Sequence, residues 1–147
     1  MTPGKFLCTV VHVATYSLIA SSPCATAVED EKGTAAKSPA VLFSSQLPDI
    51  PGKHLVVVSL ELPPKSTRPF TAHRHPGSVY VYVTKGSARL GIEGQPVQEV
   101  HEGQSFFEPP GALHTVGESA SETAPASAIA VMIVPDGAPL VTVEHQH

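Results

Sequence analysis

Three histidines have the type and spacing that suit metal chemistry. His73 and His75 are separated only by Arg74, and residues two apart in an extended strand point to the same face. Two imidazoles on one face can chelate one metal ion. His114 follows later in the chain, directly after the turn residues Pro109-Pro110-Gly111. The His-x-His pair alone is weak evidence, and the third histidine behind its turn strengthens the prediction of a metal site.

Glu108 is the carboxylate closest to this turn. It directly follows Phe106 and Phe107, and it precedes His114 by six positions. One hypothesis makes it a catalytic residue, either as a replacement ligand or as a general acid or base whose pKa is raised by apolar neighbours. The alternative is a strand-end carboxylate that reaches solvent or pairs with an arginine. The candidate arginines are Arg68, Arg74 and Arg89.

The elements that must position these residues are predicted to be short strands. The 147 residues include 15 Pro and 11 Gly, which leave few windows for a helix of three turns. Apolar runs instead alternate with turn residues about every ten residues, a pattern typical of a sandwich or barrel. The predicted strands are residues 53–62, 78–84, 87–93, 97–101, 104–108, 112–117 and 127–134, and residues 118–125 are predicted to be a loop. One all-β domain is the fold that this pattern favours.

The run at 78–84 shows which side chains should face the interior. Counting by two from His75 puts Val79, Val81 and Val83 on the inner face. Tyr80 and Tyr82 then point the other way, where we expect them to make contacts between sheets.

The first residues have the pattern of a secretory signal. Residues 6–20 are almost free of charge but shorter than the roughly 20 apolar residues of a membrane span, and small residues follow at Ala25 and Ala27. We expect residues 1–27 to be a signal peptide, 28–40 a flexible leader, 41–144 the folded domain and 145–147 a tail. The mature protein would then be periplasmic or secreted. The alternative is a buried N-terminal strand in a cytosolic protein.

Composition excludes several classes of partner and site. Both cysteines, Cys8 and Cys24, precede the predicted cleavage point, so the mature chain would have no disulfide and no cysteine-ligated zinc. The formal charge is −4, Lys and Arg are scattered, and no Trp is present. These features argue against a nucleic-acid partner, and no membrane partner is expected after signal cleavage.

The spacing around the histidines resembles two motifs of the cupin superfamily. The first runs Gly, five residues, His-x-His, three or four residues, Glu, six residues, Gly. The second runs Gly, five residues, Pro-x-Gly, two residues, His, three residues, Asn. Seven positions match in spacing and identity: His73, His75, Gly86, Gly103, Pro109, Gly111 and His114. The resemblance covers residues 55–134 and implies a single-domain cupin, a double-stranded β-helix or jelly-roll barrel with a metal in its mouth.

Three positions depart from the family pattern. Thr67 stands where the first motif has Gly, and Glu118 stands where the second ends in Asn. Val79 occupies the position of the carboxylate ligand, so the expected metal ligands are only His73, His75 and His114. With no anion among these three, we expect an anionic small molecule to bind the ion more strongly than in the usual site.

The resemblance implies two classes of function. Three-histidine sites occur among cupin dioxygenases, so one expectation is a metal-dependent dioxygenase or isomerase that acts on a small anionic organic substrate. The other is a non-catalytic binding module for a small ligand or the ion itself. Iron is the expected metal, with nickel, copper, zinc and manganese as alternatives. By the same resemblance we expect a homodimer, with residues 41–50 as the candidate contact.

The remaining histidines are assigned no role in the site. His54 and His101 lie beside turn residues and are expected at the surface, and His145 and His147 belong to the C-terminal tail.

Overall fold

The computed structural model of the chain describes residues 39–67 and 69–144. These residues form strands, turns and irregular segments, and none of them is helical. The strands are β1 (Ala40–Gln46), β2 (Lys53–Leu62), β3 (His73–Arg74), β4 (Ser78–Lys85), β5 (Ser87–Ile92), β6 (Gln98–His101), β7 (Ser105–Glu108), β8 (Leu113–Ser119), β9 (Ala126–Pro135) and β10 (Thr142–Val143). The prediction of an all-β fold is therefore confirmed.

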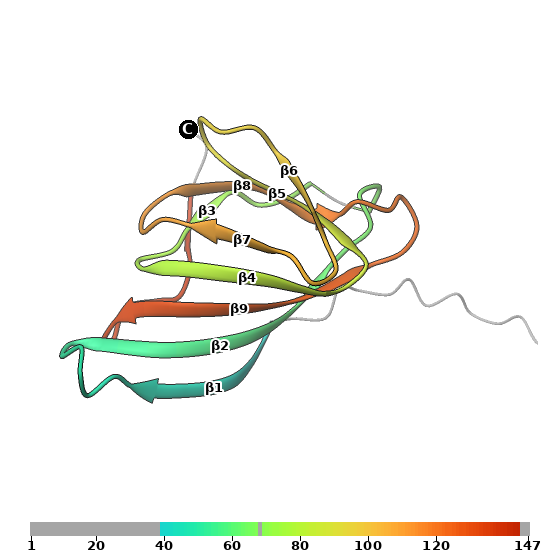
Figure 1. Cartoon of the computed structure of the whole chain (residues 1–147). Helices are drawn as coiled ribbons and strands as arrows, with labels where there is room; N and C mark the ends of the chain where they lie inside the picture. Colours follow the sequence, from blue (N-terminus) through green and yellow to red (C-terminus); the bar gives the residue numbers. More distant parts are fainter. Residues whose placement is uncertain (1–38, 68, 145–147) are drawn as a thin grey trace, which may run out of the picture. The chain divides into compact units, whose positions relative to one another are not determined.

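The strands form two antiparallel sheets of five strands each. The first sheet has the order β1-β2-β9-β4-β7, and the second has the order β10-β3-β8-β5-β6. Figure 1 shows the five strands of the first sheet side by side in this order. Because β3 and β8 belong to one sheet while β4 and β7 belong to the other, the two histidine motifs bring residues of both sheets together.

The interior is filled by alternate residues of the long strands, as the period of two requires. On β4, Val79, Val81 and Val83 are at most 2% exposed, which confirms their predicted inward orientation. Valine, leucine and alanine side chains of β2, β5 and β9 complete this apolar core, together with Phe106.

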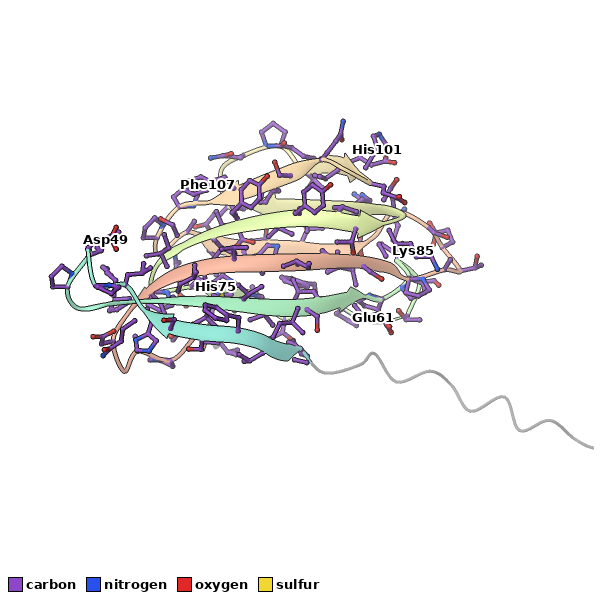
Figure 2. All side chains as sticks on the ribbon, turned by 60° about the horizontal axis from the view of Figure 1, so that its bottom comes forward. Asp49, Glu61, His75, Lys85, His101 and Phe107 are labelled. Carbon is purple, nitrogen blue, oxygen red and sulfur yellow. The ribbon has the colours of Figure 1, made fainter. Side chains whose placement is uncertain are left out.

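The opposite side of the first sheet differs from the expectation. Tyr80 and Tyr82 are 46% and 40% exposed, so the prediction that they make contacts between sheets is wrong. They share this outer face with Phe107 of β7, which Figure 2 labels. No described residue covers these rings, because the second sheet packs on the inner face only.

The seven predicted runs correspond to β2 and to β4 through β9, whereas β1, β3 and β10 were not among them. Within the predicted runs, the clearest difference lies in β8. β8 continues to Ser119, two residues into the predicted loop. The reason is backbone pairing, because Glu118 and Ser119 lie opposite Arg89 and Ala88 of β5. The prediction of a loop is therefore wrong for these two residues.

The N-terminal expectations mostly fall on residues that the structure does not describe. The predicted signal peptide, the leader up to residue 38 and the tail at 145–147 lie outside the described residues. β1 begins at Ala40, one residue before the predicted start of the domain, and all of its side chains are exposed. In the described part of the chain, no helix has the length and apolar character needed to span a membrane.

Candidate metal centre

The register of two short strands brings the histidines together. His73 of β3 lies directly opposite His114 of β8, and His75 follows β3 by one residue. The turn before β8 is hydrogen-bonded to the residue that follows β3, since the Gly111 N–H donates to the His75 carbonyl over 2.8 Å. Gly111 has a φ of +74°, which glycine adopts without the steric cost that a side chain would add. This hydrogen bond links the first histidine motif to the second.

Each of the three imidazoles donates one ring N–H to a backbone carbonyl. His73 Nδ1 is 2.9 Å from the Thr71 oxygen, His75 Nδ1 is 2.7 Å from the Leu140 oxygen, and His114 Nε2 is 2.7 Å from the Val116 oxygen. A carbonyl oxygen can only accept, so these nitrogens carry the protons. The lone pairs of the neutral rings therefore lie on His73 Nε2, His75 Nε2 and His114 Nδ1. Metal-binding histidines are commonly oriented by such hydrogen bonds.

The free nitrogens converge on a small space. His73 Nε2 and His75 Nε2 are 3.2 Å apart, and donor atoms of all three histidines lie within 4.8 Å of one another. Two lone pairs cannot form a hydrogen bond with each other, and a metal ion bound to both nitrogens would account for their close approach. The predicted trio of site histidines is brought together by the structure.

Burial keeps two of these rings in the form that binds metal. Burial lowers the pKa of His75. The hydrogen bond to Leu140 acts in the opposite direction and raises this pKa, and the nearby His73 lowers it further. Burial also lowers the pKa of His114 to about 4, and His73 adds to this shift. Because a metal binds neutral imidazole, these two rings need not lose a proton at neutral pH.

Glu108 faces the same space from the other sheet. Its side chain is only 2% exposed, and its Oε2 lies 3.5 Å from His114 Nδ1 and 3.7 Å from His75 Nε2. Burial raises the pKa of this carboxyl group to about 7. Among the described residues, neither Glu108 Oε2 nor His114 Nδ1 has a hydrogen-bond partner.

The alternative interpretation of Glu108 finds no support in its exposure or in the two described arginines. A residue that is 2% exposed does not reach solvent. Arg74 instead pairs with Glu144, and Arg89 pairs with Glu118. The third candidate, Arg68, lies outside the described residues.

Phe70 belongs to the site although the sequence did not suggest it. Its ring centre is 5.2 Å from that of His73 and 4.8 Å from that of His114. Phe70 lies between two predicted strands in a segment without periodicity, so no pattern pointed to it. Its contacts limit the movement of two of the three rings.

A cavity of about 450 Å³ opens over the histidines and Glu108. Its walls are mostly apolar, and among the described residues that line it none is Lys or Arg. Apolar side chains of β2, β4 and β9 form much of the wall, including Val58, Leu60, Val81 and Met132. A volume of this size suits a small organic molecule.

The other histidines lie apart from this cluster. His54 Nδ1 bonds to Asp136 over 2.6 Å, and the His101 side chain is 58% exposed beside Ser87. Neither lines the cavity. His145 and His147 lie outside the described residues.

Comparison with known protein families gives a match over residues 58–132, to the cupin domain. The chain belongs to the cupin family. This match spans more than half of the chain and includes both histidine motifs, which confirms the resemblance seen in the sequence. No curated protein shows significant similarity to the cupin described here.

Solved structures share the cupin fold at low sequence identity. A cupin-like protein from Thermotoga maritima has a TM-score of 0.56 and 17% identity over 74% of this chain and 75% of its own. A Klebsiella pneumoniae protein with a double-stranded β-helix domain has a TM-score of 0.53 and 19% identity, covering 73% of this chain and 83% of its own. These similarities confirm the jelly-roll fold.

A DMSP lyase from Ruegeria pomeroyi, DddQ, also has this fold. Its TM-score is 0.51 with 20% identity, and the match covers 60% of this chain but only 42% of the lyase. The similarity therefore concerns the barrel, and the lyase is a considerably longer protein.

The residues of this cupin fit a divalent metal ion. Three imidazole lone pairs and a carboxylate oxygen face one another without hydrogen-bond partners among the described residues, apart from the 3.2 Å contact of His73 with His75. Buried polar atoms normally have partners, and an ion would supply one to all four. The three-histidine cluster therefore suggests a metal site.

Proposed function

We propose that this cupin is a metal-dependent dioxygenase or isomerase that acts on a small anionic organic substrate. The observation that carries the proposal is the pair of unpartnered buried atoms, Glu108 Oε2 and His114 Nδ1, at an apolar cavity of about 450 Å³. Such a cavity with a few convergent polar groups is the usual form of a substrate site.

His73, His75 and His114 would hold the ion. A bound divalent ion would supply Lewis-acid stabilisation of an anionic substrate and, in the case of iron, redox chemistry. The chain itself orients the three rings through the carbonyls of Thr71, Leu140 and Val116. Phe70 packs against two of them.

The cavity walls indicate what kind of substrate fits. Since no Lys or Arg is among the described residues that line it, the ion would be the cation available to a substrate anion. Glu61 also lines the cavity, and its charge disfavours a second anionic group. We therefore propose a substrate with one anionic group and an otherwise apolar skeleton.

Glu108 belongs to this centre in one of two roles. It would either bind the ion or move a proton of the substrate, and both roles make it essential for turnover.

A non-catalytic binding module is the second candidate. The observation in its favour is Val79, which stands in place of the carboxylate ligand of the family motif. In that case the ion and the cavity would capture a small ligand without converting it.

Oxygen uptake and product analysis separate the two candidates. The purified protein, loaded separately with iron, nickel, copper, zinc and manganese, is mixed with diketones, thiols and phenolic acids. The enzyme proposal predicts turnover of a substrate with at least one metal and a loss of turnover in His114→Ala. Binding of a test compound without turnover under any metal would favour the binding module.

We also propose that the protein is exported. Support comes from the uncharged run at 6–20 and from Ala25 and Ala27 behind it. Mass spectrometry of the protein from its producing cells should then find a mature N-terminus at Val28. An intact N-terminal segment on the mature protein would contradict export.

A further inference from the structure

We infer that Glu108 is the fourth protein ligand of the ion, so that β7 supplies the carboxylate that the family motif places on β4. This inference rests on the proposed metal centre. It assigns a ligand to a position that the second motif leaves unspecified, and it thereby defines the charge of the site.

The strand register makes this exchange possible. Val79 of β4 and Glu108 of β7 are directly opposite each other in the first sheet. Both side chains point inward, with exposures of 1% and 2%. Directly paired residues have Cβ atoms about 4.5–5.5 Å apart, so a carboxylate on either strand reaches the same part of the interior. Val79 lacks a ligand atom, and its partner supplies one.

The distances are those of atoms that share an ion. Donor atoms that each lie about 2.1 Å from one ion are about 3.0 Å apart as neighbours in an octahedron and about 3.4 Å apart in a tetrahedron. Glu108 Oε2 lies 3.5 Å from His114 Nδ1 and 3.7 Å from His75 Nε2. His75 Nε2 is in turn 3.2 Å from His73 Nε2. The carboxylate oxygen is thus within a few tenths of an ångström of the tetrahedral spacing from two of the three histidines, His114 and His75.

Among the residues that the structure describes, no Lys or Arg pairs with Glu108. Buried carboxylates are normally paired or coordinate metals. Arg74 and Arg89 are engaged elsewhere. A divalent ion would pair with the carboxylate and the three lone pairs together.

If Glu108 binds the ion, the charge expected of the substrate changes. Three neutral imidazoles would leave the full charge of a divalent ion to the substrate, whereas a bound Glu108 carboxylate cancels one unit of that charge. A substrate with a single negative charge then neutralises the centre. This agrees with a cavity that is lined by Glu61 and by no described Lys or Arg.

Cobalt(II) binding to the purified, tag-free protein tests the inference without any substrate. The dissociation constant is measured by competition with a chelator, and the visible absorption spectrum reports the ligand set. Glu108→Gln keeps the shape of the side chain but removes the anionic ligand. We expect its affinity for cobalt to fall on the order of 100-fold and its spectrum to change.

Two further variants make the test specific. Val79→Glu/Glu108→Val moves the carboxylate to the opposite strand, and it should restore the affinity to within about tenfold of the wild type. Glu118→Gln removes another carboxylate that lines the cavity, and it should leave affinity and spectrum unchanged. If the double variant does not fold, the isosteric Glu108→Gln decides the question alone.

The outcomes separate the two proposals. Unchanged cobalt affinity and spectrum in Glu108→Gln, with the wild type binding one ion, would overturn the ligand role and leave the three-histidine centre in place. A wild-type protein that binds no cobalt, iron or other divalent transition metal would overturn the metal centre itself, and Glu108 with it.

Discussion

Gly117 and Phe70 are in such close contact that a methyl group on Gly117 would lie 2.5 Å from Cε2 of the Phe70 ring. The same ring packs against His73 and His114. The absence of a side chain at position 117 therefore allows Phe70 to lie over the metal centre.

Gly117→Ala should accordingly displace the Phe70 ring. We expect a loss of about 1–3 kcal/mol in the free energy of unfolding, because overpacking a filled site forces neighbours to shift. Metal affinity should fall as well, since two of the ligand rings lose their packing partner. Urea denaturation and cobalt titration measure the two effects.

The matched control is Gly117→Ala/Phe70→Leu, in which a smaller side chain makes room for the methyl group. This double variant should recover most of the stability. A Gly117→Ala protein as stable as the wild type would show that the contact does not constrain Phe70.

The stability of the metal-free protein should depend on pH through Glu108. Burial raises the pKa of this carboxyl group from 4.5 to about 7. The carboxyl group of Glu108 therefore holds its proton more tightly in the folded state than in the unfolded state. The resulting stabilisation of the fold is complete below about pH 4.5 and is lost as the pH rises through about 7. Above this range the ionised carboxylate destabilises the metal-free fold.

Glu108→Gln removes this dependence. In metal-free protein at about pH 8, the variant should be more stable than the wild type by about 3 kcal/mol, from the size of the pKa shift. Near pH 4.5 the advantage should be much smaller. Urea denaturation in the presence of a chelator measures the difference, and a difference that is the same at both pH values would contradict the assigned ionisation.

β1 offers the surface for the expected homodimer. It pairs with β2 on one side only, and Val41, Leu42 and Phe43 are each more than half exposed. Unprotected edge strands with apolar side chains tend to pair with another chain. We predict a dimer in sedimentation experiments and a shift to monomer in Val41→Lys/Phe43→Lys.

Val97→Lys is the control for this prediction, since Val97 is an exposed apolar residue that precedes β6 in the other sheet. It should leave the dimer intact. A wild-type protein that sediments as a monomer at all concentrations would exclude β1 as a dimer contact.

The local pattern of the sequence was sufficient for much of the fold. The alternation on β4 correctly placed Val79, Val81 and Val83 inside, and the turn residues marked the ends of β2 as Lys53 and Leu62. Such features depend on neighbouring residues only, so a single sequence contains them.

Features that depend on distant pairing could not be predicted in this way. β10 has two residues and thus no period, yet the carbonyl of Leu140, shortly before it, orients His75. The partnership of Val79 with Glu108 depends on the register between β4 and β7, which no local pattern encodes. Tyr80 and Tyr82 were misplaced because aromatic residues suggest burial, whereas the second sheet covers only the other face.

Metal analysis of the mature protein, purified without a histidine tag, tests the central claim most directly. The wild type should contain about one equivalent of a divalent transition metal, and His114→Ala should contain less than about half an equivalent. His101→Ala, which changes an exposed histidine outside the cavity, should retain the metal. A full equivalent of metal in His114→Ala, or none in the wild type, would contradict a centre built on His73, His75 and His114.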